Sequence, residues 1–139
     1  MGYKNKAYVI DENLVLSKAQ VLPNADDADS TVVNYGGNSL GYMKIVVKAH
    51  TEIVIPVEGT FAIVASYGNT SSPTDTLKKV LYTVSVAEGG DEITIPAGET
   101  ICEEIISDSL PDNYKYVKLS YTTDADLSDY SVDAFVVMA

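Results

Sequence analysis

The stretch that decides the fold is YKYVKLSYT (residues 114–122), followed after an acidic turn at 124–129 by YSVDAFVVM (residues 130–138). In the first segment, alternate positions from Val117 to Tyr121 are apolar, which is the period typical of a strand with one buried face. The second segment alternates at first and then becomes apolar on both faces, as a strand does in the middle of a sandwich. We interpret the two segments as the closing hairpin of an all-β domain, for which the rest of the chain builds a partner sheet.

Other short apolar segments recur along the chain, separated by turn signals and without a convincing amphipathic helix. The segments that we expect to be strands are 31–35, 42–49, 53–55, 60–67, 78–87, 93–95 and 101–106. In 78–87 we expect Val80, Tyr82, Val84 and Val86 to share one face, and 101–106 to be an edge strand. The pattern predicts a jelly-roll-like antiparallel β-sandwich of about eight short strands.

The length of 139 residues indicates one globular domain with an arm in front of it. Two short apolar pieces, 7–10 and 14–17, are interrupted by a polar triplet and do not form a pattern that fills a core alone. We therefore divide the chain into an N-terminal extension and extended arm (1–16) and a single β-sandwich domain (17–139). Residues 24–30 are expected to be an acidic loop.

The formal net charge is −11, with nine Lys, no Arg and twenty Asp plus Glu. Such a chain repels a phosphate backbone and anionic membrane surfaces, so we expect neither a nucleic-acid nor a membrane partner. No apolar run approaches the ~18 residues of a membrane span, and the N-terminus lacks the apolar core of a signal peptide. The one cysteine, Cys102, excludes an internal disulfide and fits synthesis in a reducing compartment.

Signals for chemistry are weak, so we expect no enzyme, no cofactor and no metal site. A nucleophilic pair of His50 and Cys102 is conceivable, but an incidental surface histidine and a semi-buried cysteine are the simpler interpretation. Residues 124–128 begin like a calcium loop, yet the later glycine and glutamate of that loop are missing. The acidic cluster at 26–29 is likewise expected to be a solvated loop. Ten tyrosines against two phenylalanines suit either interfaces or packing at sheet edges, and both alternatives stay open.

Several segments occur in an order that resembles a known family. They are Asp11 with Leu14-Val15-Leu16-Ser17-x-x-Gln20, the strands 40–47 and 61–67, Pro96-Ala97-Gly98, Leu110-Pro111 and Tyr116-x-Lys118-Leu119-x-Tyr121. In this ordered set the chain resembles the capsid cement (decoration) proteins of tailed bacteriophages, of the kind known from a Bordetella phage. The similarity covers about residues 9 to 138. Residues 1–8 extend beyond the usual start, and Lys118 stands where the family often has Arg.

The resemblance implies a structural virion protein with a jelly-roll-like fold, made in the host cytoplasm and located on the outer capsid surface. It would bind the major capsid protein, form a homodimer or homotrimer, and cement neighbouring capsomers so that the expanded shell is stabilised. The alternative is a carbohydrate- or receptor-binding β-sandwich module of a phage particle. The residues expected at the capsid or oligomer interface are Tyr8, Val9, Ile10, Leu14, Val15 and Leu16 on the arm, with Tyr42 and Tyr116.

Overall fold

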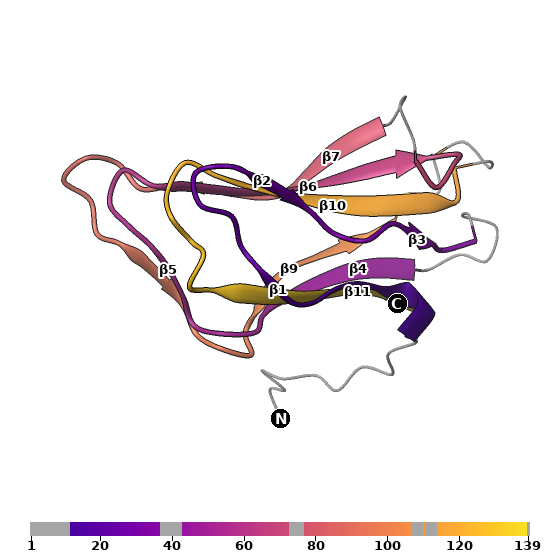
Figure 1. Ribbon diagram of the computed structural model, residues 1–139, viewed down its shortest axis with the longest axis horizontal. Coiled ribbons are helices and arrows are strands. Elements are labelled where there is room, and N and C mark those ends of the chain that lie inside the picture. The colour runs from indigo at the N-terminus through magenta and orange to yellow at the C-terminus, as the bar shows by residue number, and fades with distance from the viewer. Residues whose placement is uncertain (1–11, 37–42, 73–76, 107–109, 111–113, 139) are drawn as a thin grey trace.

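Two β-sheets packed face to face make up the molecule (Figure 1). The computed structural model describes residues 12–36, 43–72, 77–106, 110 and 114–138. In chain order the elements are the 3-10 helix η1 (Glu12–Leu14) and the strands β1 (Val15–Val21), β2 (Asp27–Asp29), β3 (Val33–Asn34), β4 (Met43–Ala49), β5 (Ile53–Ile55), β6 (Thr60–Gly68), β7 (Leu77–Ser85), β8 (Ile93–Ile95), β9 (Thr100–Ile105), β10 (Tyr116–Thr123) and β11 (Ser131–Met138).

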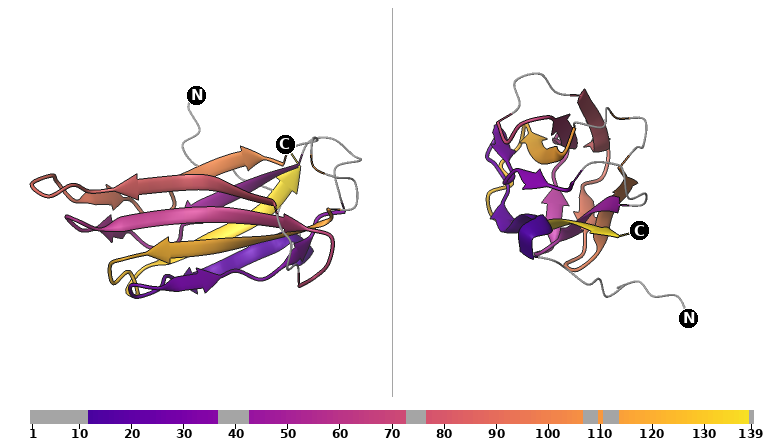
Figure 2. Two further views of the ribbon diagram at one scale, coloured as in Figure 1. Left: turned by 90° about the horizontal axis from the view of Figure 1, so that it is seen from above. Right: turned by 90° about the vertical axis from the view of Figure 1, so that its right-hand side faces the viewer.

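The strands divide between two main sheets and one small extension. The β11 sheet has the order β1-β11-β4-β9, and the β10 sheet has the order β2-β10-β6-β7, with β3 also paired to β10. The short strands β5 and β8 pair with each other at one end of the sandwich. Figure 2 shows the two layers from above and from one end, with the long strands of one sheet lying across those of the other.

The topology is that of a jelly roll, as the sequence predicted. β6 and β7 form a hairpin, and outward from it β5 pairs with β8, β4 with β9, β2 with β10 and β1 with β11, always antiparallel. The chain is therefore one long two-stranded ribbon that has rolled up so that its successive sections lie in alternate sheets. Rolling buries one face of each section against the other layer, which a flat ribbon cannot do.

The expected closing hairpin at the C-terminus is wrong. β10 belongs to one sheet and β11 to the other, so the two strands face each other across the core instead of sharing hydrogen bonds. The connection between them carries Leu127, which is fully buried and whose N–H donates to the Pro23 carbonyl (3.1 Å). The acidic turn thus contains a buried apolar residue, Leu127, at the point where the chain passes from one sheet to the other.

Four further expectations can be compared with the structure. The edge position of β9 is confirmed, since β9 is the last strand of the β11 sheet. The loop expected at 24–30 contains the short strand β2. In β7 a bulge opposite Ile63 and Val64 shifts the alternation, so Val80 is 58% exposed while Tyr82 and Val84 pack against the core. The boundary expected after residue 16 falls inside β1.

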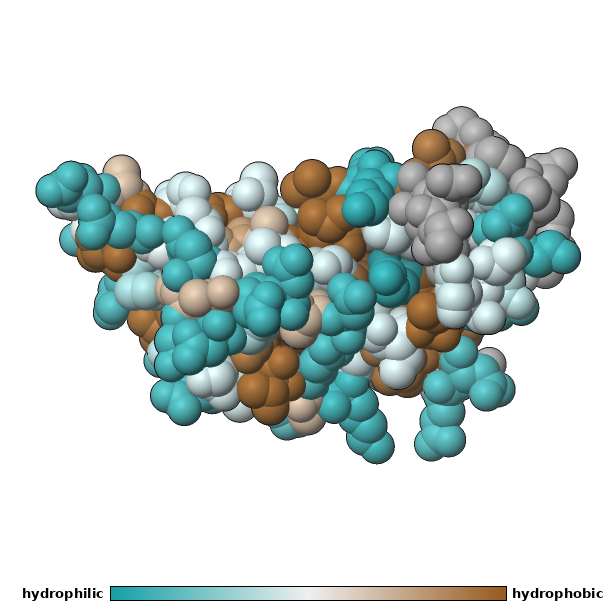
Figure 3. Space-filling view, turned by 45° about the horizontal axis from the view of Figure 1, so that its top comes forward, coloured by the Kyte–Doolittle hydropathy of each residue, from teal (hydrophilic) through white to brown (hydrophobic). Residues whose placement is uncertain are grey.

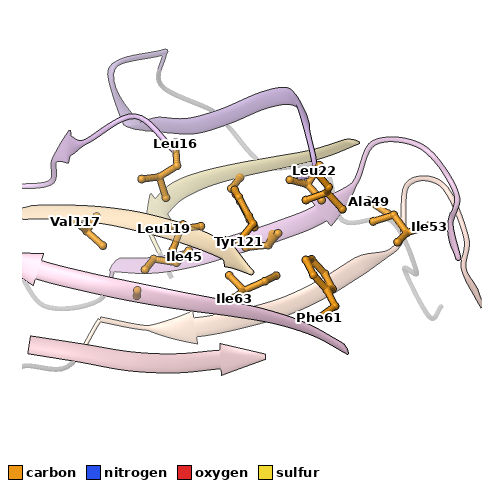
Figure 4. Packing of buried hydrophobic residues seen from close by; sticks show 14 of the residues in the cluster. Leu16, Leu22, Ile45, Ala49, Ile53, Phe61, Ile63, Val117, Leu119 and Tyr121 are labelled. Carbon is orange, nitrogen blue, oxygen red and sulfur yellow. The ribbon is translucent and has the colours of Figure 1, made fainter. Parts of the chain in front are cut away.

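The core lies between the sheets and is filled by side chains from every long strand (Figure 4). Tyr121 of β10 is its largest fully buried side chain, and Leu16 and Ile63 lie nearby from the two layers. Because Leu16 is only 1% exposed, the first residues of β1 are part of the sandwich. Phe61 and Tyr82 add a tilted ring pair with centroids 6.0 Å apart.

A chain of hydrogen bonds joins the two sheets inside this core. The Tyr121 hydroxyl lies 2.8 Å from Ser17 Oγ, and Ser17 Oγ donates to Gln20 Oε1 (2.6 Å). Since the single hydroxyl proton of Ser17 goes to Gln20, Tyr121 is the donor to Ser17. Gln20 Nε2 in turn donates to the Asp29 carbonyl of β2 (2.9 Å), so β10, β1 and β2 are tied together.

A bulge in β1 makes this arrangement possible. Ser17 pairs with Ala134, whereas Gln20 pairs with Val132, so extra backbone is accommodated between Ser17 and Gln20. Within the bulge Ala19 has a φ of 46°, and its N–H donates to Asp133 Oδ1 of β11 (2.7 Å). The carboxylate of Asp133 thus holds the bulge in a conformation that a non-glycine residue rarely adopts.

Replacing Ser17 is expected to destabilise the protein more than replacing Tyr121 by phenylalanine. Ser17→Ala leaves the buried Tyr121 hydroxyl without a partner, which costs about 1–3 kcal/mol, whereas Tyr121→Phe removes the bond and its donor together and costs about 0.5–1.5 kcal/mol. Urea unfolding at constant m-value measures both, with the exposed Thr122→Ala on the same strand as a control. A Ser17→Ala midpoint equal to that of the wild-type chain would contradict the role of this bond.

Stability is expected to fall on the alkaline side. Burial raises the pKa of Tyr35 from 10.0 to about 12 and that of Cys102 from 9.0 to about 12, and it raises the pKa of Tyr67 and Tyr121 as well. Above about pH 9 the unfolded chain therefore loses protons that the folded chain keeps, so the free energy of unfolding decreases from there towards the folded-state pKa values. Urea midpoints between about pH 8 and about pH 11 measure the decrease, and a constant midpoint over this range would contradict it.

Candidate functional site

The residues expected at an interface do not form one surface. Val15 lies on the outer face of the β11 sheet, whereas Tyr116 lies half-buried on the β10 sheet, paired with Gly68 and Asn34. Leu14 packs against the main core. The expectation that Leu16 contacts a partner is corrected, because its side chain points between the sheets. Tyr8, Val9, Ile10 and Tyr42 lie outside the described residues.

The outer face of the β11 sheet carries an apolar row that sequence reasoning did not identify as a surface feature. Ile45 and Val47 of β4 point into the core, so the residue between them, Val46, points away from it. Cross-strand register places Val46 beside Phe135, and Phe135 beside Val15. With Val137 from β11 they form what we call the outer patch: Val15, Val46, Phe135 and Val137.

Two polar side-chain pairs border the outer patch on the same face. Lys44 Nζ lies 3.2 Å from Glu103 Oε2 across β4 and β9. At the other end of β4, His50 Nδ1 lies 2.9 Å from Asp133 Oδ2. The apolar centre itself is buried, with Val46 0%, Phe135 4% and Val137 5% exposed, so on this face the polar pairs are more accessible than the patch.

The outer face of the β10 sheet has a different character. Its centre is made of small side chains, among them Ala62, Val64 and Ser66 of β6 and Ser120 of β10. At its border Lys118 Nζ lies 3.3 Å from Asp29 Oδ2. Figure 3, turned to bring the top of the molecule forward, shows hydrophobic residues in separate patches among polar ones on this side.

The loops at one end of the sandwich concentrate negative charge. Jelly-roll topology brings six connections to this end, at the left in Figure 1: 22–26, 50–52, 56–59, 86–92, 96–99 and 124–130. These loops contain no lysine and ten of the twenty carboxylates, all exposed: Asp26, Glu52, Glu58, Glu88, Asp91, Glu92, Glu99, Asp124, Asp126 and Asp129. We call this the acidic end.

Two carboxylates of the acidic end are engaged with the backbone. Asp124 Oδ1 accepts a hydrogen bond from the Thr60 N–H (2.7 Å), and Asp126 Oδ1 accepts from the N–H (3.0 Å) and Oγ (2.5 Å) of Ser128. These bonds from Ser128 lower the pKa of Asp126. Within the described ranges no three His, Cys, Asp or Glu side chains gather closely enough to hold a metal ion.

The structure does not pair His50 with Cys102. The His50 ring bonds to Asp133 on the outer face, while Cys102 on β9 packs against the core. Burial, then the nearby carboxylates of Glu104 and Glu103, raise the pKa of the Cys102 thiol to about 12. A thiol with this pKa is not a nucleophile near neutral pH.

A shallow hollow of about 200 Å³ lies beside the β5–β8 extension. Tyr82, Thr94, Ile95, Glu99, Thr100 and Ile101 line it. The lining residues carry one aromatic ring, three hydroxyls and one carboxylate. Tyr82 also packs on Phe61, and burial raises the pKa of its phenol.

The described tyrosines favour packing over interface roles. Tyr35, Tyr67 and Tyr121 are at most 5% exposed, and the other tyrosines in the described ranges are half-buried. Tyr35 and Tyr67 form an edge-to-face pair with centroids 6.4 Å apart, and the Tyr35 hydroxyl donates to the Tyr114 carbonyl (2.5 Å).

In the part of the chain that the structure describes, no helix is long and apolar enough to cross a membrane.

Comparison with known proteins identifies no family. No family model and no curated protein matches the chain. Among solved structures, it is similar to the Clostridium thermocellum endo-1,4-beta-D-xylanase 10B, in a structure of its CBM22-1 and GH10 modules complexed with xylohexaose. The identity is 16% and the TM-score 0.41, over 91% of this chain and 28% of that chain.

Proposed function

We propose that the protein is a structural virion protein that binds the outer surface of a tailed-phage icosahedral capsid and cements neighbouring capsomers. Its partners would be the major capsid protein and further copies of itself, in a homodimer or homotrimer. The ordered motifs that resemble cement proteins support the proposal, and so does the jelly-roll fold, which is frequent among capsid proteins. The observation that carries it is the distribution of charge along the molecule.

The acidic end is suited to face away from a shell. Its ten exposed carboxylates are not balanced by any lysine in the same loops, so it is strongly hydrated and repels other acidic surfaces. The opposite end holds η1, the start of β7 and the start of β10 (Figure 1). There Lys78 and Lys115 are exposed. We therefore place the shell contact at the end with Lys78 and Lys115.

The mechanism of cementing is mechanical. A closed oligomer repeats its shell-binding surface, and each repeat holds a different capsomer, so weak contacts combine into strong attachment. Because the protein would bind only the expanded shell, attachment stabilises that state by mass action. The gain is about 2.7 kcal/mol for each site at a free concentration one hundred times the Kd.

Reversing charge at the two ends of the molecule is expected to have unequal effects on capsid decoration. Lys78→Glu with Lys115→Glu should weaken binding to expanded empty capsids by about tenfold or more, since both changes introduce repulsion at the contact. The matched variant Glu88→Lys with Asp91→Lys should bind as the wild-type chain does. Co-sedimentation with capsids, followed by electron microscopy of the particles, measures both. Loss of binding in the acidic-end variant alone would reverse the proposed orientation.

Tests of the arm require point changes instead of a deletion. Removing residues 1–16 also removes Leu16, whose buried side chain belongs to the core, so such a chain loses stability whether or not the arm touches a shell. Loss of decoration after that deletion would thus have two explanations.

The hollow beside β8 supports carbohydrate binding as the second candidate. The lining residues Tyr82, Thr94, Thr100 and Glu99 provide the mixture of apolar and polar groups that is found in sugar sites. If this is the function, a glycan array should show binding that Glu99→Gln weakens about tenfold, because one charged hydrogen bond is lost. The exposed Glu92→Gln is the control. If the array shows no binding, the carbohydrate proposal is wrong and the capsid proposal is the one that remains.

A further inference from the structure

In the described ranges, two sheet edges on one side of the sandwich lack a neighbouring strand in their own sheet. β7 is the last strand of the β10 sheet, and β9 is the last strand of the β11 sheet. The two strands contact each other, and the Lys79 ammonium pairs with the Glu104 carboxylate between them. Since β7 and β9 belong to different sheets, the sandwich is open along the line where their edges meet.

The second half of β7 carries backbone groups that point away from its sheet. The Val86 N–H donates to the Gly59 carbonyl (3.0 Å), and successive residues of a strand direct their backbone groups to opposite sides. The N–H and C=O groups of Thr83 and Ser85 therefore point outward from the edge. Among the described residues, none forms a hydrogen bond with these groups. A row of unpaired backbone groups is a template for an added strand.

The edges of β1 and β2 and the first half of β7 are protected against such pairing. The β1 edge is covered by Thr31, whose N–H donates to the Leu16 carbonyl (3.0 Å), and β2 is only three residues long. In β7 a bulge interrupts the edge just before Tyr82, and two lysines precede the bulge. Short strands, bulges and lysines are the usual means of preventing edge-to-edge pairing. The unprotected stretch of β7 is therefore 82–85.

The hollow lies beside this stretch. Tyr82 lines it from β7, and β8 and β9 supply most of its remaining lining. Its volume of about 200 Å³ is below the roughly 300 Å³ at which pockets for drug-sized ligands begin, so it suits a single side chain. Tyr82, Ile95 and Ile101 supply its apolar wall, and among the described residues that line it Glu99 alone is charged.

Charge around the hollow determines which side chain it accepts. Glu99 belongs to the acidic end, whose loops hold ten exposed carboxylates and no lysine. The loop that follows β7, 86–92, contributes Glu88, Asp91 and Glu92. A lysine or arginine side chain combines an apolar stem, which fits the tyrosine and isoleucine wall, with a positive head, which fits Glu99. An acidic side chain would be repelled.

We propose that the protein binds an extended, basic peptide segment of a partner protein as an added strand along 82–85 of β7, with one lysine or arginine side chain in the hollow. Main-chain hydrogen bonds to Thr83 and Ser85 supply affinity, and the hollow selects the basic side chain. The proposal does not rest on the capsid function, since the edge and the hollow belong to the free protein. It differs from carbohydrate binding at the same hollow, because a sugar needs no strand edge.

Fluorescence anisotropy with labelled peptides tests the proposal on the full chain. The probe alternates valine and threonine around a central lysine. We expect saturable binding that weakens at least about tenfold when glutamate replaces the central lysine, and at least about tenfold when alternate backbone amides are N-methylated. Absence of saturable binding at millimolar probe overturns the proposal, and so does equal affinity for the N-methylated probe.

Matched variants of the protein test the two parts of the site. Glu99→Gln should weaken binding of the lysine probe about tenfold, whereas Glu92→Gln should leave it unchanged. Thr83→Pro removes one outward N–H, which an edge strand tolerates, and should weaken binding at least about tenfold, whereas Thr83→Ala should not. If circular dichroism shows that the proline variant does not fold, the N-methylated probe provides the same test of the edge.

Two other occupants of this side of the sandwich would overturn the proposal. Self-association in sedimentation velocity that Thr83→Pro abolishes would assign the edge to a second copy of the chain. Oligosaccharide binding that Glu99→Gln weakens and Thr83→Pro leaves unchanged, in a protein that does not bind the lysine probe, would assign the hollow to a sugar.

Discussion

The hydrogen bond between Tyr121 and Ser17 is the contact on which the arrangement of the two sheets depends. It joins the centre of β10 to β1, and these strands lie in different layers. A phenol that is fully buried must keep its hydroxyl bonded, so the side chain fixes where β1 can lie. The bulge at Ala19 and its bond to Asp133 bring Ser17 and Gln20 into position, which explains why a serine and a glutamine occur three residues apart in the first strand.

Rolling the ribbon separates the molecule into parts with different physical properties. One end gathers six loops that contain ten exposed carboxylates, and the opposite end holds η1 and the exposed lysines of β7 and of the segment before β10. The two broad faces also differ, since one has a buried apolar patch and the other a centre of small side chains. Function is therefore more readily sought at the ends than on the faces, because the ends carry the groups that remain exposed.

Sequence patterns predicted the parts of the fold that depend on local periodicity. The alternation in 114–122 and in 42–49 indicated strands because a half-buried strand requires a period of two, and the structure has β10 and β4 there. The prediction of the interface residues on the arm depended on a different assumption, namely that a segment with an interrupted apolar pattern lies outside the core. Leu16 shows why that assumption was wrong: β1 gains its burial from β11, more than one hundred residues later, which no local pattern reveals.

The sequence by itself determined the all-β class, the jelly-roll type, most strand positions and the acidic character of the chain, since these follow from composition and from the period of the apolar residues. Only the tertiary structure decided which strands pair. An apolar strand can form hydrogen bonds in either sheet, so whether two consecutive strands form a hairpin or lie in different sheets depends on partners that are distant in the sequence. β10 and β11 lie in different sheets, and the connection between them carries Leu127, whose side chain is buried in the core between those sheets. The concentration of charge at one end was likewise decided by topology, because the ten carboxylates are spread over six loops that only the rolled ribbon brings together.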